Sequence, residues 1–158
     1  MSADGRSVSI LGVTGSVGAS TIEVIAELRA QGQMIPVEAV TAGRNIEALV
    51  AACRRLRPRF AALADASLLD AARGALAGLE VEVGAGPGAL AEAGARPADW
   101  VMSAIVGAAG LAPTMAAVRR GALVAIANKE CLVCAGPLML AAARASGARL
   151  LPVDSEHN

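Results

Sequence analysis

The chain has 158 residues, 55% of them hydrophobic, which suits a single domain with a substantial apolar core. Its formal net charge at pH 7 is zero and only 18% of its residues are charged, which argues against attachment to nucleic acid or to a membrane surface. No apolar run approaches the roughly 18 residues of a membrane span, and the first ten residues lack the apolar segment of a signal peptide, so we expect a cytoplasmic protein.

From the first residues onward, short apolar stretches of strand length alternate with helical patterns. In the first half of the chain the predicted strands occupy residues 7–12, 36–43, 59–65 and 79–84. The helical pattern that follows the second of these strands begins behind an Asn45 N-cap. The fourth strand, LEVEVG, alternates strictly between apolar and polar residues, which predicts a half-exposed strand near an edge of a sheet.

The second half of the chain begins with a segment rich in Gly, Pro and Ala. This segment, 84–98, could be a domain linker, but it is short and lies between strands, so we expect an ordinary loop region. Residues 100–107 are almost entirely apolar, which predicts a central strand, and 111–121 form a helix that stops at Gly121. The remaining predicted elements are a strand over 122–129, a helix over 137–147 and a buried strand over 148–154.

Strands separated by helices in this way require parallel crossovers. The predicted fold class is therefore α/β, a doubly wound parallel sheet with helices on both faces. No internal repeat is visible. Ligands of such sheets bind outside the carboxyl ends of the strands, so the loops that follow the strands are where we expect a site.

Two features away from the strand ends could also carry function. The basic cluster RRLRPR (54–59) suits the solvated C-terminal turn of a helix better than a nucleic-acid patch. Cys131 and Cys134 form a CxxC pair, which could be a redox pair or half of a metal site. No second CxxC or CxxH completes a zinc site, and the neighbours are apolar, so we expect buried structural thiols. With Cys53 the count is odd, and free thiols are expected.

The first strand runs into GVTGSVG, which places glycines at Gly12, Gly15 and Gly18 before a helix. Glycines let the backbone turn sharply and approach a phosphate, and the amides and dipole of a helix N-terminus favour an anion. The hydroxyls of Thr14 and Ser16 add donors for a pyrophosphate. The motif therefore favours dinucleotide binding over a merely tight turn.

The second predicted strand ends in TAGRN. An NAD site usually carries Asp or Glu at this position to bind the ribose 2′-hydroxyl, and a carboxylate would repel a 2′-phosphate. Here the chain offers Gly43, Arg44 and Asn45 instead. These residues predict NADPH in preference to NADH, whereas the alternative reading makes Arg44 a surface residue beside an N-cap.

Polar groups also follow the last three strands. The strand over 100–107 ends in small residues that would let a flat ring lie against the backbone. The next strand ends in Asn128, Lys129 and Glu130, and Lys129 is the sole lysine of the chain. The last strand delivers Asp154 and Glu156, which are spaced to lie on one face. Three polar clusters at neighbouring strand ends favour a site over solvated loops.

Several of these stretches together resemble one family. The motifs ILGVTGSVG, AGRN, AIVGAAGLAPTMAAVRRG, ANKECLV and LLPVDSEHN are similar to the N-terminal part of 1-deoxy-D-xylulose 5-phosphate reductoisomerase. The resemblance runs the length of the chain and is densest from 103 to 158. It implies a Rossmann-like NADPH-binding domain and an enzyme of the non-mevalonate isoprenoid pathway that depends on NADPH and a divalent metal.

The resemblance also implies roles for individual residues. Contacts to NADPH are implied for Thr14, Gly15, Ser16, Val17, Gly43, Arg44, Asn45, Asn128 and Glu130. Binding of the phosphosugar substrate is implied for Lys129, Ser155 and Glu156, with Lys129 and Glu156 as catalytic residues. Asp154 and Glu156 are the implied ligands of Mg²⁺, Mn²⁺ or Co²⁺, to which hard oxygen ligands are suited. His157 could orient the substrate or be a bystander.

The resemblance divides the chain into an NADPH-binding domain over 1–150 and the start of a catalytic and metal-binding region over 151–158. In the family a third carboxylate, a phosphate grip, a lid and a helical domain follow this point, and the sequence does not contain them. We therefore expect a truncated form that binds NADPH without turnover. Cys131 stands where the family usually has Ser, a small change beside the cleft. Family members form homodimers, so the full-length protein is expected to do so.

Two rival interpretations remain open at this point. One is another NADPH-dependent dehydrogenase, of the semialdehyde or dihydrodipicolinate kind, with a similar glycine turn. The motifs ANKE and VDSEHN disfavour it. The other rival is a non-catalytic nucleotide-binding module that pairs with a partner.

Overall fold

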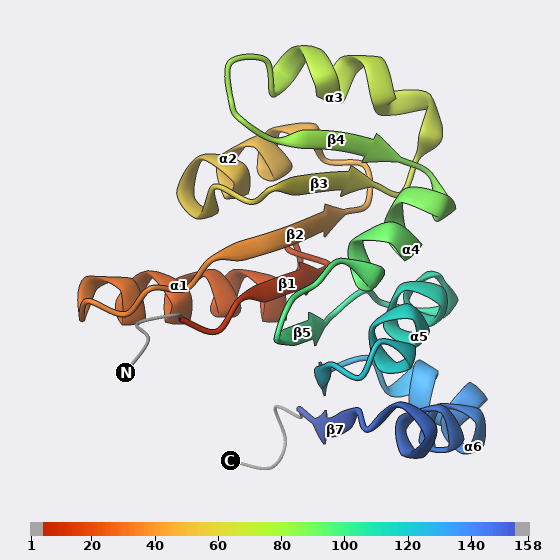
Figure 1. The fold of residues 1–158 in the computed structure, drawn as a ribbon. Helices are drawn as coiled ribbons and strands as arrows, with labels where there is room; N and C mark the ends of the chain where they lie inside the picture. The colour runs from red at the N-terminus through yellow and green to blue at the C-terminus, as the bar shows by residue number, and fades with distance from the viewer. Residues whose placement is uncertain (1–4, 154–158) are drawn as a thin grey trace.

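The computed structural model describes residues 5–153, which form one seven-stranded parallel sheet with helices on both faces (Figure 1). The strands are β1 (Val8–Leu11), β2 (Val37–Ala42), β3 (Phe60–Leu63), β4 (Glu82–Ala85), β5 (Trp100–Ser103), β6 (Leu123–Ile126) and β7 (Arg149–Pro152). The helices are α1 (Ser16–Ala30), α2 (Ile46–Leu56), α3 (Leu69–Ala75), α4 (Pro87–Ala95), α5 (Leu111–Arg119) and α6 (Lys129–Ser146), with 3₁₀ turns η1 (Ala66–Leu68) and η2 (Ala108–Gly110).

The helices pack in two layers, α1 to α3 against one face of the sheet and α4 to α6 against the other (Figure 1). Because side chains alternate along a strand, each strand contributes to both cores. In β1, Val8 and Ile10 belong to the core beneath α1 and α2, whereas Leu11 belongs to the core beneath α4, α5 and α6. The expected doubly wound α/β fold is confirmed.

The strand order is β4-β3-β2-β1-β5-β6-β7, so β1 lies at the centre and pairs with both β2 and β5. From β1 the chain adds β2, β3 and β4 on one side, then crosses over and adds β5, β6 and β7 on the other. The loops after β1 and β5 consequently diverge to opposite faces. A crevice at the carboxyl ends of these two strands is where open α/β sheets bind ligands.

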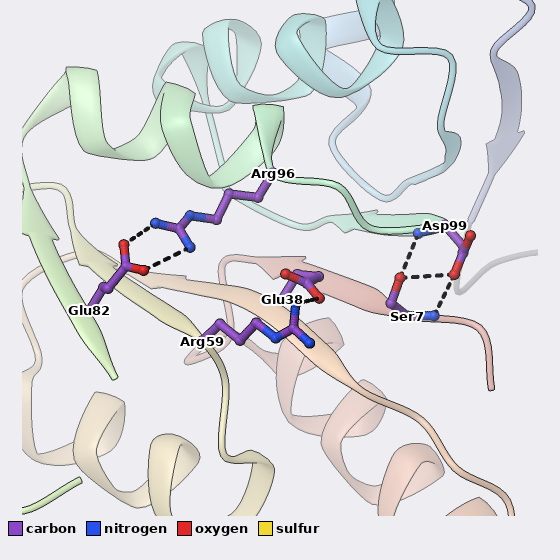
Figure 2. Close-up of polar contacts among 6 residues, drawn as sticks. All are labelled: Ser7, Glu38, Arg59, Glu82, Arg96 and Asp99. Carbon is purple, nitrogen blue, oxygen red and sulfur yellow. Dashed lines mark hydrogen bonds and ion pairs between the residues drawn. The ribbon is translucent and has the colours of Figure 1, made fainter. Parts of the chain in front are cut away.

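Polar contacts link neighbouring strands at the amino edge of the sheet (Figure 2). The backbone N–H and the hydroxyl of Ser7 donate to Asp99 Oδ2 at 2.7 and 2.8 Å, which ties the start of β1 to the start of β5. Arg59 Nη1 pairs with Glu38 Oε1 at 3.1 Å and so compensates the charge of a Glu38 side chain that is only 6% exposed. Figure 2 also shows Arg96 paired with Glu82 at the start of β4.

The structure corrects the prediction for the Gly, Pro and Ala-rich segment. Residues 84–98 contain helix α4, not a loop. Gly86 adopts φ +89°, which lets the chain turn out of β4, and Pro87 then starts the helix at its first position. Leu90 and Ala93 of this helix are buried in the second core. The segment is so rich in Gly and Ala that the two sides of the helix differ little in hydropathy. The sequence therefore shows no clear helical pattern here.

The C-terminal elements also differ from the prediction. Helix α6 begins at Lys129 rather than at Pro137, because Asn128 caps an additional turn and the helix continues through a kink at Ala135. Strand β7 is not a buried strand: it is an edge strand, and its Leu151 is 44% exposed. An apolar run predicts burial only where both faces of the strand are covered, and the apolar run of β7, unlike the alternation of β4, does not show that the strand lies at an edge.

The thiols are free, as expected, but they are not all buried. Cys53 and Cys131 are buried whereas Cys134 is exposed on α6, so the prediction of buried thiols was wrong for Cys134. Burial raises the pKa of the Cys53 thiol to about 11. The basic cluster was expected in the last turn of α2, and Arg54 and Arg55 do lie there. The rest of the cluster continues past Leu56, where the helix ends with Arg57 in the left-handed region at φ +50°. Strand β4 lies at the edge, as its alternation predicted.

Candidate functional site

The candidate site lies at the carboxyl edge of the sheet, where the loops after β1, β2, β5 and β6 gather. All seven strands are parallel, so these loops emerge on the same edge. The glycine motif follows β1, which places it at the point where the direction of winding reverses.

Gly12 makes the first turn of this motif possible. It adopts φ +92°, and a Cβ at this position would lie 2.7 Å from the carbonyl carbon of Ala104 at the end of β5. Its N–H donates to the Thr41 hydroxyl at 2.8 Å, and the N–H of Val13 donates to the Thr41 carbonyl at 2.7 Å. The turn is therefore held from both sides, by β2 through hydrogen bonds and by β5 through close backbone contact.

Gly18 allows helix α1 to begin directly above this turn. A Cβ on Gly18 would lie 2.3 Å from the Gly12 carbonyl oxygen and 2.7 Å from the backbone of Val13. The N-cap residue of α1 is Gly15, and no side chain caps the helix. An uncapped N-terminus leaves backbone N–H groups for an anion. Thr14, Gly15 and Ser16 are exposed around it, and Val17 is half-buried.

The loop after β2 carries the predicted selectivity residues. Asn45 caps α2, because its Oδ1 accepts a hydrogen bond from the N–H of Ala48 at 2.9 Å. A Cβ on Gly43 would meet no atom within 4 Å, so the space beside this backbone is open. The Arg44 side chain is 77% exposed, and its Nη1 lies 2.7 Å from Asp65 Oδ2. The loop thus presents one guanidinium at this edge of the sheet.

The loops after β5 and β6 are joined by Asn128, which is 3% exposed. Its Oδ1 accepts a hydrogen bond from the N–H of Cys131 at 3.2 Å and so caps α6. Its Nδ2 donates to the carbonyl oxygens of Ile105 and Gly107, the latter at 3.0 Å. Asn128 therefore fixes the loop after β5, and its predicted contact with the cofactor stays a prediction.

The other predicted residues of this region occupy the start of α6 and the end of the chain. Lys129 and Glu130 are the first two residues of α6 and both are exposed. Asp154, Ser155, Glu156 and His157 lie outside the described residues, so the predicted metal ligands stay predictions. Within residues 5–153, no three His, Cys, Asp or Glu side chains cluster as a metal site would require, and no helix is long and apolar enough to span a membrane.

Sequence reasoning missed three polar residues at this edge. Thr41, fully buried, holds the glycine turn. Thr114 joins α5 to β5 through a buried hydroxyl pair with Ser103 at 2.5 Å. Asp65 binds Arg44. Asp65 is the last residue of a predicted strand, so its place at this edge could be inferred from the sequence. Thr41 and Thr114 lie in apolar stretches, where nothing in the sequence indicates their contacts.

A cavity of about 680 Å³ lies at the opposite edge of the sheet, beside the end of α2 and the starts of β3 and β4. Its lining includes Cys53, Arg54, Arg57 and Val81. Ligands of open parallel sheets bind at the carboxyl ends of the strands, so this cavity is not the candidate site.

Comparison with known proteins settles the family. The family model described as 1-deoxy-D-xylulose 5-phosphate reductoisomerase matches residues 8–136. The chain belongs to this reductoisomerase family. The reductoisomerase of Rhodospirillum centenum is 56% identical over 153 residues, and that of Ruegeria pomeroyi is 59% identical over 153 residues. Each alignment covers 97% of this chain, but only 37% and 38% of the respective relatives, so the chain spans less than two fifths of their length.

Solved reductoisomerase structures have the same architecture. The enzyme from Zymomonas mobilis in complex with NADPH superimposes with a TM-score of 0.92 at 50% identity, over 99% of this chain and 40% of that one. A reductoisomerase in complex with NADPH, fosmidomycin and magnesium gives a TM-score of 0.87 at 35% identity, over 96% of this chain and 37% of that one. The family and the Rossmann-like fold expected from the sequence are both confirmed.

Proposed function

We propose that this chain is the NADPH-binding portion of a 1-deoxy-D-xylulose 5-phosphate reductoisomerase. The observation that carries the proposal is the glycine turn, which brings the uncapped N-terminus of α1 to the switch point of the sheet. The residues fit the cofactor, because side chains are absent where the backbone must approach a pyrophosphate and a cation follows the adjacent strand. Relatives solved with NADPH share this architecture at 35% and 50% identity.

In this proposal the dinucleotide lies along the carboxyl edge. Its pyrophosphate binds the amides and hydroxyls at the start of α1, and its 2′-phosphate binds the loop after β2. The proposed NADPH-binding residues are Thr14, Gly15, Ser16, Val17, Gly43, Arg44, Asn45, Asn128 and Glu130. Residues 1–150 form the proposed NADPH-binding domain. When bound, NADPH supplies the hydride for a reduction.

The catalytic part of the proposal concerns the end of the chain. Lys129, Ser155 and Glu156 would bind a phosphosugar substrate, with the Lys129 ammonium placing positive charge near its oxygens. Asp154 and Glu156 would hold Mg²⁺, Mn²⁺ or Co²⁺ through hard oxygen ligands. A bound divalent cation would supply Lewis acidity to the substrate oxygens. Residues 151–158 thus begin the proposed catalytic region.

The full reaction is proposed for the longer protein of which this chain matches the first part. That reaction rearranges 1-deoxy-D-xylulose 5-phosphate and reduces the product with NADPH to 2-C-methyl-D-erythritol 4-phosphate, in a cytoplasmic homodimer. Binding of NADPH is the part of this reaction that is proposed for the 158 residues of this chain.

Parallel calorimetric titrations of the chain with NADPH and NADH test this proposal. We expect tighter binding of NADPH, because only this cofactor presents a 2′-phosphate to Arg44. Arg44→Asp should lower the NADPH preference by about tenfold or more, since charge-assisted hydrogen bonds to phosphate contribute more than neutral ones. Arg73→Asp, on the exposed side of α3, is the matched control and should change neither affinity. Equal affinity of the wild-type chain for the two cofactors would refute the proposal.

A further inference from the structure

The guanidinium of Arg44 is bound from the neighbouring strand end. Arg44 follows β2 and Asp65 follows β3, and these strands are adjacent. Arg44 Nη1 and Asp65 Oδ2 lie 2.7 Å apart, although the Arg44 side chain is 77% exposed and the Asp65 side chain only 21%. A long exposed side chain is thus held at one end by a largely covered carboxylate.

The Asp65 carboxylate is itself held in place. It caps η1, and its Oδ1 accepts hydrogen bonds from the N–H of Ser67 at 2.9 Å and from the Ser67 hydroxyl at 2.6 Å. These two bonds, and the charge of Arg44, hold the pKa of Asp65 below its ordinary value of 3.8. Asp65 is therefore ionised at neutral pH, with one oxygen fixed by Ser67 and the other facing Arg44.

We propose that Asp65 is a positioning residue for Arg44 that increases the selectivity of the site for a dinucleotide carrying a 2′-phosphate. This inference rests on the proposed function. An arginine side chain with free rotamers loses conformational entropy when it binds a phosphate, and an arginine already restrained loses less. Arg44 Nη1 faces Asp65 Oδ2, and the fork of the guanidinium offers further N–H donors for a phosphate.

The negative charge of Asp65 also acts against NADPH binding, so repulsion and restraint predict opposite results when this charge is removed. A carboxylate near the 2′-phosphate repels it, so removal of the charge would tighten NADPH binding if repulsion dominated. Removal of the charge would instead weaken NADPH binding if restraint of Arg44 dominates. The pair is largely exposed to solvent on the Arg44 side, where long-range repulsion is screened, whereas the contact at 2.7 Å is direct. We therefore expect the restraint to dominate.

Asp65→Asn is the decisive variant, because an amide oxygen can still accept from Ser67 while the charge that holds Arg44 is lost. Calorimetric titration should show NADPH affinity lowered by about twofold to fivefold, as for the loss of an exposed ion pair, with NADH affinity unchanged. In an Arg44→Met background the same substitution should have no further effect. Asp70→Asn, an exposed acid on α3, is the matched control.

The thermal unfolding temperature of each variant shows whether it folds. If Asp65→Asn does not fold, Ser67→Ala keeps the ion pair and removes one restraint on Asp65, and it should lower the NADPH preference in the same direction. The inference would be overturned if folded Asp65→Asn kept or increased the preference for NADPH over NADH. It would also be overturned if Asp65→Asn lowered NADPH affinity as much in the Arg44→Met background as in the wild type. Either result would leave the proposed function standing, whereas a wild-type chain without NADPH preference would remove both.

Discussion

Substitution of Gly18 by Ala tests the packing of the glycine turn. Gly18 is the third residue of α1, and Ala is ordinarily the better helix former by up to about 1 kcal/mol. At Gly18 we expect the opposite effect, a loss of stability on substitution by Ala. The new Cβ would lie 2.3 Å from the Gly12 carbonyl oxygen and 2.7 Å from both the Cα and the carbonyl carbon of Val13. These are backbone atoms of a turn that β2 and β5 hold, so they cannot rotate away as a flexible side chain would.

The magnitude follows from two opposing contributions. Overpacking of a well-filled site costs about 1–3 kcal/mol, and the helical gain of Ala offsets up to about 1 kcal/mol of it. We therefore expect Gly18→Ala to lower the free energy of unfolding by about 1–2 kcal/mol. For a chain of this length the unfolding temperature should fall by about 2–8 °C.

Equilibrium unfolding in urea measures this free energy directly. Gly74→Ala is the matched control, because Gly74 is also helical, lies exposed in α3, and has no atom within 4 Å of its Cβ position. It should leave stability unchanged or raise it by up to about 1 kcal/mol. If Gly18→Ala proved as stable as Gly74→Ala, the turn would not be tightly packed and the structural basis for the pyrophosphate site would be lost.

Two further predictions concern titration and reactivity. A thiol reagent at pH 8 should label Cys134 rapidly, but Cys53 and Cys131 only on unfolding. Cys53 and Cys131 are buried, and burial raises the pKa of each of these two thiols. Equal labelling rates for all three thiols would contradict the burial pattern. Hydrogen bonds from Ser7 hold the pKa of Asp99 below its ordinary value of 3.8. The stability contributed by ionised Asp99 is therefore complete above that value and is lost as pH falls through the lower native pKa. Asp99→Asn should lower the unfolding temperature at pH 7, and in acid the unfolding temperatures of the variant and the wild type should converge. A difference in unfolding temperature that stays constant across pH would show that the carboxylate charge plays no part.

The success of the sequence reasoning at the strand ends has a physical basis. A parallel sheet places every carboxyl end on one edge, so residues that follow different strands can be grouped without coordinates. The glycine motif, Arg44 and Asn128 were found by this rule, and the structure places all of them on that edge. Asp65 obeys the same rule and was nonetheless overlooked, because its role is visible only through its contact with Arg44.

The wrong predictions concern segments in which hydropathy varies little along the chain, or residues whose exposure depends on which helices and strands pack beside them. Helix α4 was missed because Ala and Gly dominate its residues, and they differ little in hydropathy around the helix. Strand β7 was expected to be buried because its apolar run does not show that, within residues 5–153, its only strand neighbour is β6. Cys134 was expected to be buried for a similar reason, since apolar neighbours in sequence do not place a residue on the inner face of a helix.

The sequence by itself determined the alternation of strands and helices, the parallel sheet and the family, because periodicity, glycine positions and short motifs are local properties of the chain. The tertiary structure decided what depends on residues far apart in sequence. It placed β1 between β2 and β5, brought Ala104 against Gly12, and joined Asp65 to Arg44. Contacts of this kind depend on how helices and strands pack in three dimensions, and no periodic pattern along the chain records that packing.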